Sequence, residues 1–86
     1  MDIRRQFGRA IRGLREDNGL TQEDLAFSAR MNVTYLSDLE RGLHNPTLAI
    51  IASICFALKV QPSRLLRDVR IGSRHPKMQR KQPTSF

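Results

Sequence analysis

Residues 33–41 carry hydrogen-bonding side chains that would share one side of a helix. With Leu36 and Leu39 set to face inward, and about 100° of rotation per residue, the polar residues gather opposite them. They are Thr34, Ser37, Asp38 and Arg41, with Val33 and Tyr35 at the edges of this face. Hydroxyl, carboxylate and guanidinium groups can recognise a polar ligand through hydrogen bonds. The pattern therefore indicates a binding surface.

Catalytic and metal-binding patterns are missing from the sequence. Two histidines and one cysteine form no nucleophile–base arrangement, and no glycine-rich loop of the phosphate-binding kind is present. His44 is not expected to bind a metal, because no cluster of other ligands accompanies it. We therefore expect a protein that is not an enzyme and that has no metal and no cofactor.

The composition narrows the class of partner. Fifteen Lys and Arg residues against eight Asp and Glu give a net charge of +7, and the sequence pI is 11.1. A pI above about 9 is typical of nucleic-acid binding, although membrane surfaces and acidic proteins also attract cations. The N-terminus lacks the apolar region of a signal peptide, and the apolar run 48–58 is too short to span a bilayer. We expect a cytoplasmic protein.

Apolar spacing and helix-capping residues predict an all-α fold. Apolar residues at helical spacing from Ile3 to Leu14 indicate the first helix, and residues that favour helix starts precede the others. The predicted helices cover residues 3–17, about 22–29, about 33–41, 48–58 and 62 to about 67. Residues 1–68 then form one domain. Residues 69–86 contain five basic residues and no acid, so we predict a basic, flexible tail.

The link between the second and third helices is very short. Three residues, Arg30 to Asn32, force the helices to cross steeply, as in a helix-turn-helix motif. Ala26 is small enough for a close approach of the two helices, and Met31 can fill the turn from the core side. Arg30 stands where such a turn often needs the left-handed conformation, which costs a non-glycine residue about 1 kcal/mol.

The stretch LTQEDLAFSARMNVTYLSDLERGLHNPTL, residues 20–48, resembles the helix-turn-helix of the phage Cro/repressor family, also called the xenobiotic-response-element type. The likeness extends from Phe7 to about Leu66. Within the family, TQEDLAF and TYLSDLERG look most like controller regulators of restriction-modification systems. The resemblance implies a five-helix, lambda-repressor-like DNA-binding domain. It also implies a homodimer on a near-palindromic operator, with the third helix in the major groove.

The resemblance assigns base reading to four residues of the third helix: Val33, Thr34, Ser37 and Asp38. A valine offers only apolar contact, most naturally to a thymine methyl. Asp38 could accept a hydrogen bond from cytosine or orient a basic neighbour, and it could also be a solvated charge. The face is modest in hydrogen-bonding power, so readout of DNA shape is also plausible.

The resemblance also implies DNA-backbone contacts and one ion pair. The backbone residues would be Thr21, Gln22, Tyr35, Arg41, His44 and Asn45. Tyr35 has an alternative role as a partly buried aromatic residue beside Leu39. The implied ion pair joins Arg15 to Glu40, against the alternative of two solvated charges.

The segment LAIIASICFAL, residues 48–58, nearly lacks the polar stripe of an amphipathic helix, so we expect it to be covered on more than one side. Five of its residues match the family core: Leu48, Ile51, Ile54, Cys55 and Leu58. We predict a dimer interface centred on Ile50, Phe56 and Leu65, the alternative being a slightly apolar surface.

Three functions fit the sequence. The leading one is a sequence-specific regulator of transcription that binds double-stranded DNA. The second is an antitoxin-type regulator that also binds a protein partner. The third is a non-specific nucleic-acid-binding protein driven by the basic tail.

Overall fold

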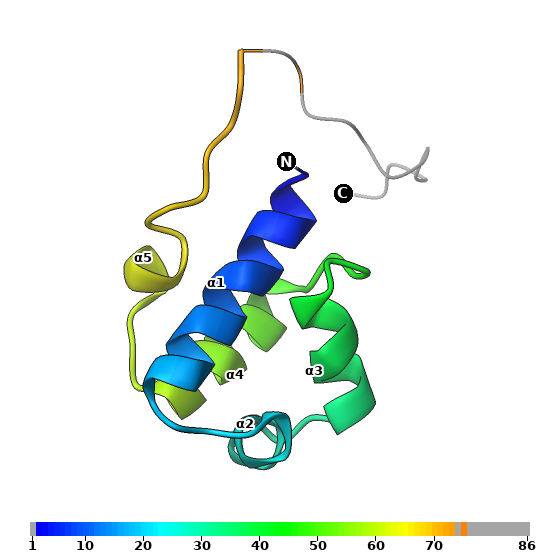
Figure 1. Ribbon diagram of the computed structural model, residues 1–86, viewed down its shortest axis with the longest axis vertical. Helices are drawn as coiled ribbons and strands as arrows, with labels where there is room; N and C mark the ends of the chain where they lie inside the picture. Colours follow the sequence, from blue (N-terminus) through cyan, green and yellow to red (C-terminus); the bar gives the residue numbers. More distant parts are fainter. Residues whose placement is uncertain (1, 74, 76–86) are drawn as a thin grey trace.

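The computed structural model describes residues 2–73 and residue 75. Over these residues the fold is all-α, as predicted (Figure 1). Its helices are α1 (Ile3–Asp17), α2 (Gln22–Ala29), α3 (Val33–Glu40), α4 (Leu48–Leu58) and α5 (Pro62–Leu65). In the view of Figure 1, α3 and α5 flank α1 on opposite sides, α4 passes behind α1, and α2 closes the lower end. The predicted bounds differ from the observed ones only at the ends of α3 and α5.

The starts of the first four helices are fixed by local hydrogen bonds. The side chains that accept a bond from the first turn are Asp2, Thr21, Asn32 and Thr47. At α2 the bond is reciprocal, since Thr21 also donates its backbone N–H to Asp24. Such caps contribute about 1 kcal/mol each. This explains why capping residues in the sequence located α2, α3 and α4, whereas α1 was located by its apolar spacing.

The turn between α2 and α3 adopts the conformation that the motif requires. Arg30 has φ 57° and ψ 48°, in the left-handed region, and the backbone N–H of Met31 donates to Ala26 O at 2.9 Å. Met31 is half-buried against the core, as expected. Lys59 is also left-handed, at the end of α4, with φ 59°. The sequence had pointed to this strained conformation only at Arg30.

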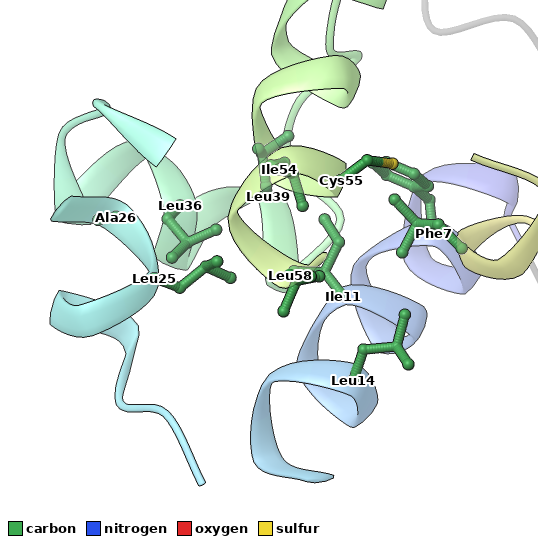
Figure 2. Close-up of a cluster of buried hydrophobic side chains, with 11 residues drawn as sticks. Phe7, Ile11, Leu14, Leu25, Ala26, Leu36, Leu39, Ile54, Cys55 and Leu58 are labelled. Atoms are coloured by element: carbon green, nitrogen blue, oxygen red, sulfur yellow. The ribbon is translucent and has the colours of Figure 1, made fainter. Parts of the chain in front are cut away.

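The hydrophobic core lies between α1, α2, α3 and α4 and is closed by α5. Figure 2 shows the labelled side chains directed toward one another from these helices. The buried set comprises Phe7, Ile11, Leu14, Leu25, Ala26, Leu36, Leu39, Ile54, Cys55, Leu58 and Leu65. Cys55 is therefore a core residue, as predicted.

Two predicted placements of leucines are wrong. Leu48 was expected in the core but is 84% exposed, and its neighbours Thr47 and Ala49 are exposed too. The first turn of α4 thus projects beyond the core. Leu65 was expected at a dimer interface but is 1% exposed, because it packs into the core that α5 closes. It offers no surface to a second copy.

The crossing of α1 and α3 depends on a glycine that the sequence had not singled out. A Cβ atom on Gly8 would clash with the backbone oxygen of Leu39 and would lie 2.5 Å from that of Glu40. Only a glycine lets α1 approach the last turn of α3 so closely. Gly8 therefore sets the position of α3 on α1.

The chain after α5 turns back along α1. The Gln6 side chain donates to Arg70 O at 2.9 Å and accepts from the Arg70 N–H at 2.7 Å. Arg70 is thus held in place, which the predicted tail from residue 69 did not anticipate. Residues 74 and 76–86 of that predicted tail lie outside the described residues. Within the described part of the chain, no helix is long and apolar enough to cross a bilayer.

Candidate nucleic-acid interface

The outer side of α3 is open because its inner side is buried on α1 and α2. Leu36 and Leu39 have almost no exposed surface. On the outer side, Val33 and Thr34 are exposed and Ser37 is half-buried. Methyl and hydroxyl groups therefore line the accessible side of this helix. The structure brings together the residues that the sequence assigned to base reading.

Asp38, the fourth of these residues, has basic partners at the C-terminal end of α3. Its Oδ1 lies 3.6 Å from Arg41 Nη1, and its Oδ2 lies 3.5 Å from His44 Nε2. This geometry favours the interpretation in which Asp38 orients basic neighbours over direct base reading. The Arg41 side chain is 67% exposed, so the pair adds little stability and leaves the guanidinium accessible to a ligand.

Tyr35 stacks on His44, with ring centroids 4.9 Å apart and an angle of 22° between the rings. Tyr35 also packs against the core and is half-buried, which agrees with the alternative role predicted for it. The stack ties α3 to the loop of residues 41–47. Asn45 is exposed in the same loop.

The start of α2 supplies the other predicted backbone contacts. The Thr21 hydroxyl caps the helix by accepting from Asp24 N at 3.0 Å, and Gln22 Nε2 donates to Glu40 Oε1 at 3.0 Å. An amide nitrogen carries two N–H groups, so this bond and a phosphate contact are compatible. The exposed acids Glu23 and Asp24 share the first turn. Their charges oppose the attraction of an anion to the N-terminus of this helix.

A buried ion pair connects α3 to the rest of the interface. Arg15 Nε donates to Glu40 Oε2 at 2.7 Å and Nη2 donates to Oε1 at 3.0 Å. Arg15 also donates to Leu20 O at 2.8 Å. The hydrogen bond to Glu40 is the main reason that the pKa of Arg15 is raised. The predicted ion pair is confirmed, and it links α1, the start of α2 and the end of α3.

Arg5 is a candidate contact that the sequence did not indicate. The first turn of α1 lies against the loop after α3, since a Cβ atom on Gly42 would be 2.7 Å from Arg5 Cγ. Arg5 is exposed beside this loop, whereas Arg4 is paired with Asp2 at 3.0 Å. Charge alone could not distinguish the two arginines, because the choice depends on which side of α1 meets the loop.

The predicted interface residues on α4 lie in different surroundings. Phe56 is 81% exposed and lines an open pocket of about 430 Å³ between α2 and α4, together with Ser28–Arg30, Ala52 and Ser53. Ile50 is half-buried against the core. At about 100° per residue, Ile50 and Phe56 lie about 120° apart around α4. The two side chains therefore do not lie at the centre of one shared surface.

Across the described residues, no group of three potential metal ligands comes together.

Comparison with known proteins agrees with this arrangement. A family model described as a helix-turn-helix domain matches residues 6–69. Control protein C.BamHI of Bacillus amyloliquefaciens is 42% identical over 73 residues, which cover 84% of this chain and 90% of that protein. Transcriptional regulator ClgR of Mycobacterium tuberculosis is 35% identical over 78 residues, covering 91% of this chain and 68% of that protein.

A solved structure extends the likeness to three dimensions. The restriction-modification controller protein C.AhdI from Aeromonas hydrophila superimposes with a TM-score of 0.71 at 37% identity. The match covers 72% of this chain and 94% of that one. The sequence resemblance, the family match and the shared fold agree with one another. The chain therefore belongs to the helix-turn-helix family of DNA-binding transcription regulators, which is not a family of enzymes.

Proposed function

We propose that the protein is a sequence-specific regulator that binds a near-palindromic operator in double-stranded DNA as a homodimer, with α3 in the major groove. The observation that carries this proposal is the outward face of Val33, Thr34 and Ser37 on a helix that is rigidly held. The Arg15–Glu40 pair and the close approach at Gly8 fix α3 from behind. A helix held in this way can keep its reading side chains in register with base edges.

The chemistry of the reading face determines what it can distinguish. Val33 would contact a thymine methyl, and the hydroxyls of Thr34 and Ser37 would bond base edges or phosphates. None of these side chains reads guanine in the bidentate way that arginine does. We therefore expect part of the specificity to come from the shape and deformability of the operator.

The phosphate contacts would come from both ends of the motif. Arg41, His44 and Asn45 lie at the end of α3 and in the loop that follows, and Arg5 joins them from α1. Thr21 and Gln22 would act at the start of α2. We expect the loop to contribute more than α2, because Glu23 and Asp24 place negative charge at that helix start. Asp38 would orient Arg41 and His44 toward the backbone.

A second copy would cover the apolar side of α4. The face formed by Leu48, Ala49, Ala52 and Phe56, here called the α4 face, is exposed at each of these residues. Its two large side chains are more than four-fifths exposed. Apolar side chains of this size stabilise association when they are buried. Ile50 would lie at the edge of such an interface.

Within the family, the assignment that we favour is a controller-type regulator of a restriction-modification system. The supporting observation is the length of the match, since the aligned region covers nine-tenths of control protein C.BamHI but 68% of ClgR. The alignment with C.AhdI covers a similarly large share of that chain.

Selection of bound duplexes from a random DNA pool, at a fixed physiological salt concentration, tests the proposal. We expect a repeated half-site with centres about 10 base pairs apart, bound by two copies of the chain. Ser37→Ala should weaken binding to the selected site more than to a scrambled duplex. The matched control Ser63→Ala, at an exposed position of α5, should change neither. A pool without an enriched sequence would contradict the proposal.

A further inference from the structure

A small pocket lies between α1 and α5, on the side of the molecule opposite α3. The two helices pack against each other, and Figure 1 shows α5 on the flank of α1 that faces away from α3. The pocket is open and has a volume of about 220 Å³. Its charged lining residues are Arg9 and Asp17 of α1, Arg64 of α5, and Arg67 and Asp68 in the turn that follows. The DNA contacts and the α4 face proposed above involve none of them.

Gly13 forms a notch in the wall of this pocket. It lies one turn after Arg9 and one turn before Asp17, so the three residues share one side of α1. A Cβ atom on Gly13 would meet no packed atom within 4 Å beyond its own part of the helix, whereas one on Gly8 would clash with the backbone of α3. A glycine inside a helix is less favourable than an alanine, and packing does not require one at position 13. The open space there suits a ligand that approaches the backbone of α1.

Two guanidinium groups of the pocket are available to an anion. Within the described part of the chain, the side chains of Arg9 and Arg64 form no hydrogen bond or ion pair. The third arginine, Arg67, lies beside an acid, with 4.0 Å between its Nε and Asp68 Oδ1. A guanidinium group binds phosphate through two parallel hydrogen bonds. A phosphate group held by Arg9 and Arg64 would therefore bridge α1 and α5.

The other end of the pocket has a different chemistry. Asp17 is the last residue of α1, about 12 Å along the helix axis from Arg9, and the C-terminal end of a helix carries partial negative charge. A second anionic group would be repelled there, whereas a hydroxyl group can donate to the carboxylate. Buried Leu14 and Leu65 also line the pocket and offer contact to carbon atoms. The volume lies below the roughly 300 Å³ at which drug-sized sites begin, so the pocket suits a small molecule.

We propose that the pocket between α1 and α5 binds a small phosphorylated polyol of the sugar phosphate class. Arg9 and Arg64 hold the phosphate group, the notch at Gly13 admits the carbon skeleton, and Asp17 accepts hydrogen bonds from hydroxyl groups. A chain in which α5 has separated from α1 lacks the site, so binding stabilises the folded domain. The inference goes beyond the proposed DNA contacts and does not depend on them, because the pocket lies on the flank of α1 opposite α3.

Isothermal titration calorimetry of the full chain, at constant ionic strength, tests the site with three probes. We expect saturable binding of ribose 5-phosphate, weaker binding of inorganic phosphate and no binding of ribose. The variant R9Q/R64Q should raise the dissociation constant for ribose 5-phosphate at least about tenfold, because it loses the charge-assisted hydrogen bonds to the phosphate group. The absence of binding by the unaltered chain, or equal binding of the two phosphate probes, would overturn the proposal.

The matched control R30Q/R41Q removes two exposed arginines from the helix-turn-helix motif. It has the same net charge as R9Q/R64Q and should bind ribose 5-phosphate as the unaltered chain does. Equal losses in the two variants would overturn the proposal, because they would reflect net charge alone.

Two further variants leave both arginines in place. Gly13→Leu fills the notch and should abolish the rise in melting temperature that ribose 5-phosphate produces in the unaltered chain. Asp17→Ala should reduce the preference for ribose 5-phosphate over inorganic phosphate. Circular dichroism melts without ligand show that each variant is folded. Undiminished binding by Gly13→Leu would overturn the placement of the ligand, and an unchanged preference in Asp17→Ala would overturn the role of that carboxylate.

Discussion

Arg15 on α1 and Glu40 at the end of α3 form a buried, two-bonded ion pair across 25 residues of sequence. Both carboxylate oxygens are engaged, at 2.7 and 3.0 Å, and Gln22 adds a third bond from α2. Their side chains are only 10% and 3% exposed. Three helices of the candidate interface therefore meet at one carboxylate. Loss of either partner would leave a buried charge without its counter-charge.

Arg15→Ala should destabilise the protein by about 3 kcal/mol, because it leaves the Glu40 carboxylate buried and unpaired. Arg12→Ala is the control, since Arg12 pairs with Glu16 at 3.1 Å on the exposed side of the same helix. That change should cost less than about 1 kcal/mol. Urea denaturation measures both. Similar costs would show that the buried pair is not a structural link.

Gly8→Ala should also destabilise the protein, by about 1–3 kcal/mol, because its Cβ would meet the backbone of α3 at Leu39 and Glu40. Gly13→Ala lies on the same helix with open space around its Cβ position. That change should stabilise the protein by about 0.5–1 kcal/mol, since alanine favours helix more than glycine does. Thermal unfolding, monitored by circular dichroism, shows whether each substitution stabilises or destabilises the protein. A stabilising Gly8→Ala would contradict the close approach of α1 and α3.

Phe56→Glu should dissociate the proposed homodimer, because it places a charge on the α4 face where the partner would bury a ring. The dimer dissociation constant should rise by at least about tenfold, since burial of a phenylalanine side chain contributes about 1.5–3 kcal/mol. Phe27→Glu is a matched control, being 86% exposed on α2. Sedimentation equilibrium compares the two. If only Phe27→Glu dissociated the dimer, the interface would lie on α2 and not on the α4 face.

Asp24→Asn should lower the melting temperature at neutral pH, and this difference should disappear in acid. The backbone N–H of Thr21 is the main cause that lowers the pKa of Asp24 below the ordinary 3.8. A carboxyl group with a lowered folded-state pKa stabilises the fold above its unfolded pKa. The contribution is lost as the pH falls through the folded-state pKa.

The measurement for Asp24 is a series of melts from about pH 7 to about pH 2, spanning the ordinary aspartate pKa. Glu23→Gln removes a charge from the same first turn without touching the capping bonds to Thr21. A difference that persists unchanged below about pH 3 would show that the effect does not come from the ionised carboxylate.

Local sequence signals predicted the helices well because their causes are local. The backbone N–H of Asp24 donates to the Thr21 hydroxyl and that of Thr34 donates to the Asn32 side chain, so these bonds join residues only two or three positions apart. A capping residue therefore acts on its own neighbours whatever the rest of the chain does. The left-handed turn at Arg30 follows for the same reason, since a link of three residues leaves the backbone few alternatives.

The resemblance to a known family supplied what local signals could not. The Arg15–Glu40 pair joins two helices that are separated in the sequence by a third. Helical spacing alone could not decide whether these residues form an ion pair or are two solvated charges. The structure agrees with the family pattern here. The base-reading and backbone-contact roles stay predictions.

The fold class, the helices and the outward polar face of α3 follow from the order of residues, because helix periodicity and capping act within a few positions. Other features depend on how helices far apart in sequence pack together. The exposure of Leu48, the burial of Leu65, the contact at Gly8 and the hydrogen bonds between Gln6 and Arg70 are of this kind. A four-residue helix such as α5 shows no periodicity from which its buried side could be inferred. Its orientation is set by the surface against which it packs, and that surface exists only once the chain has folded.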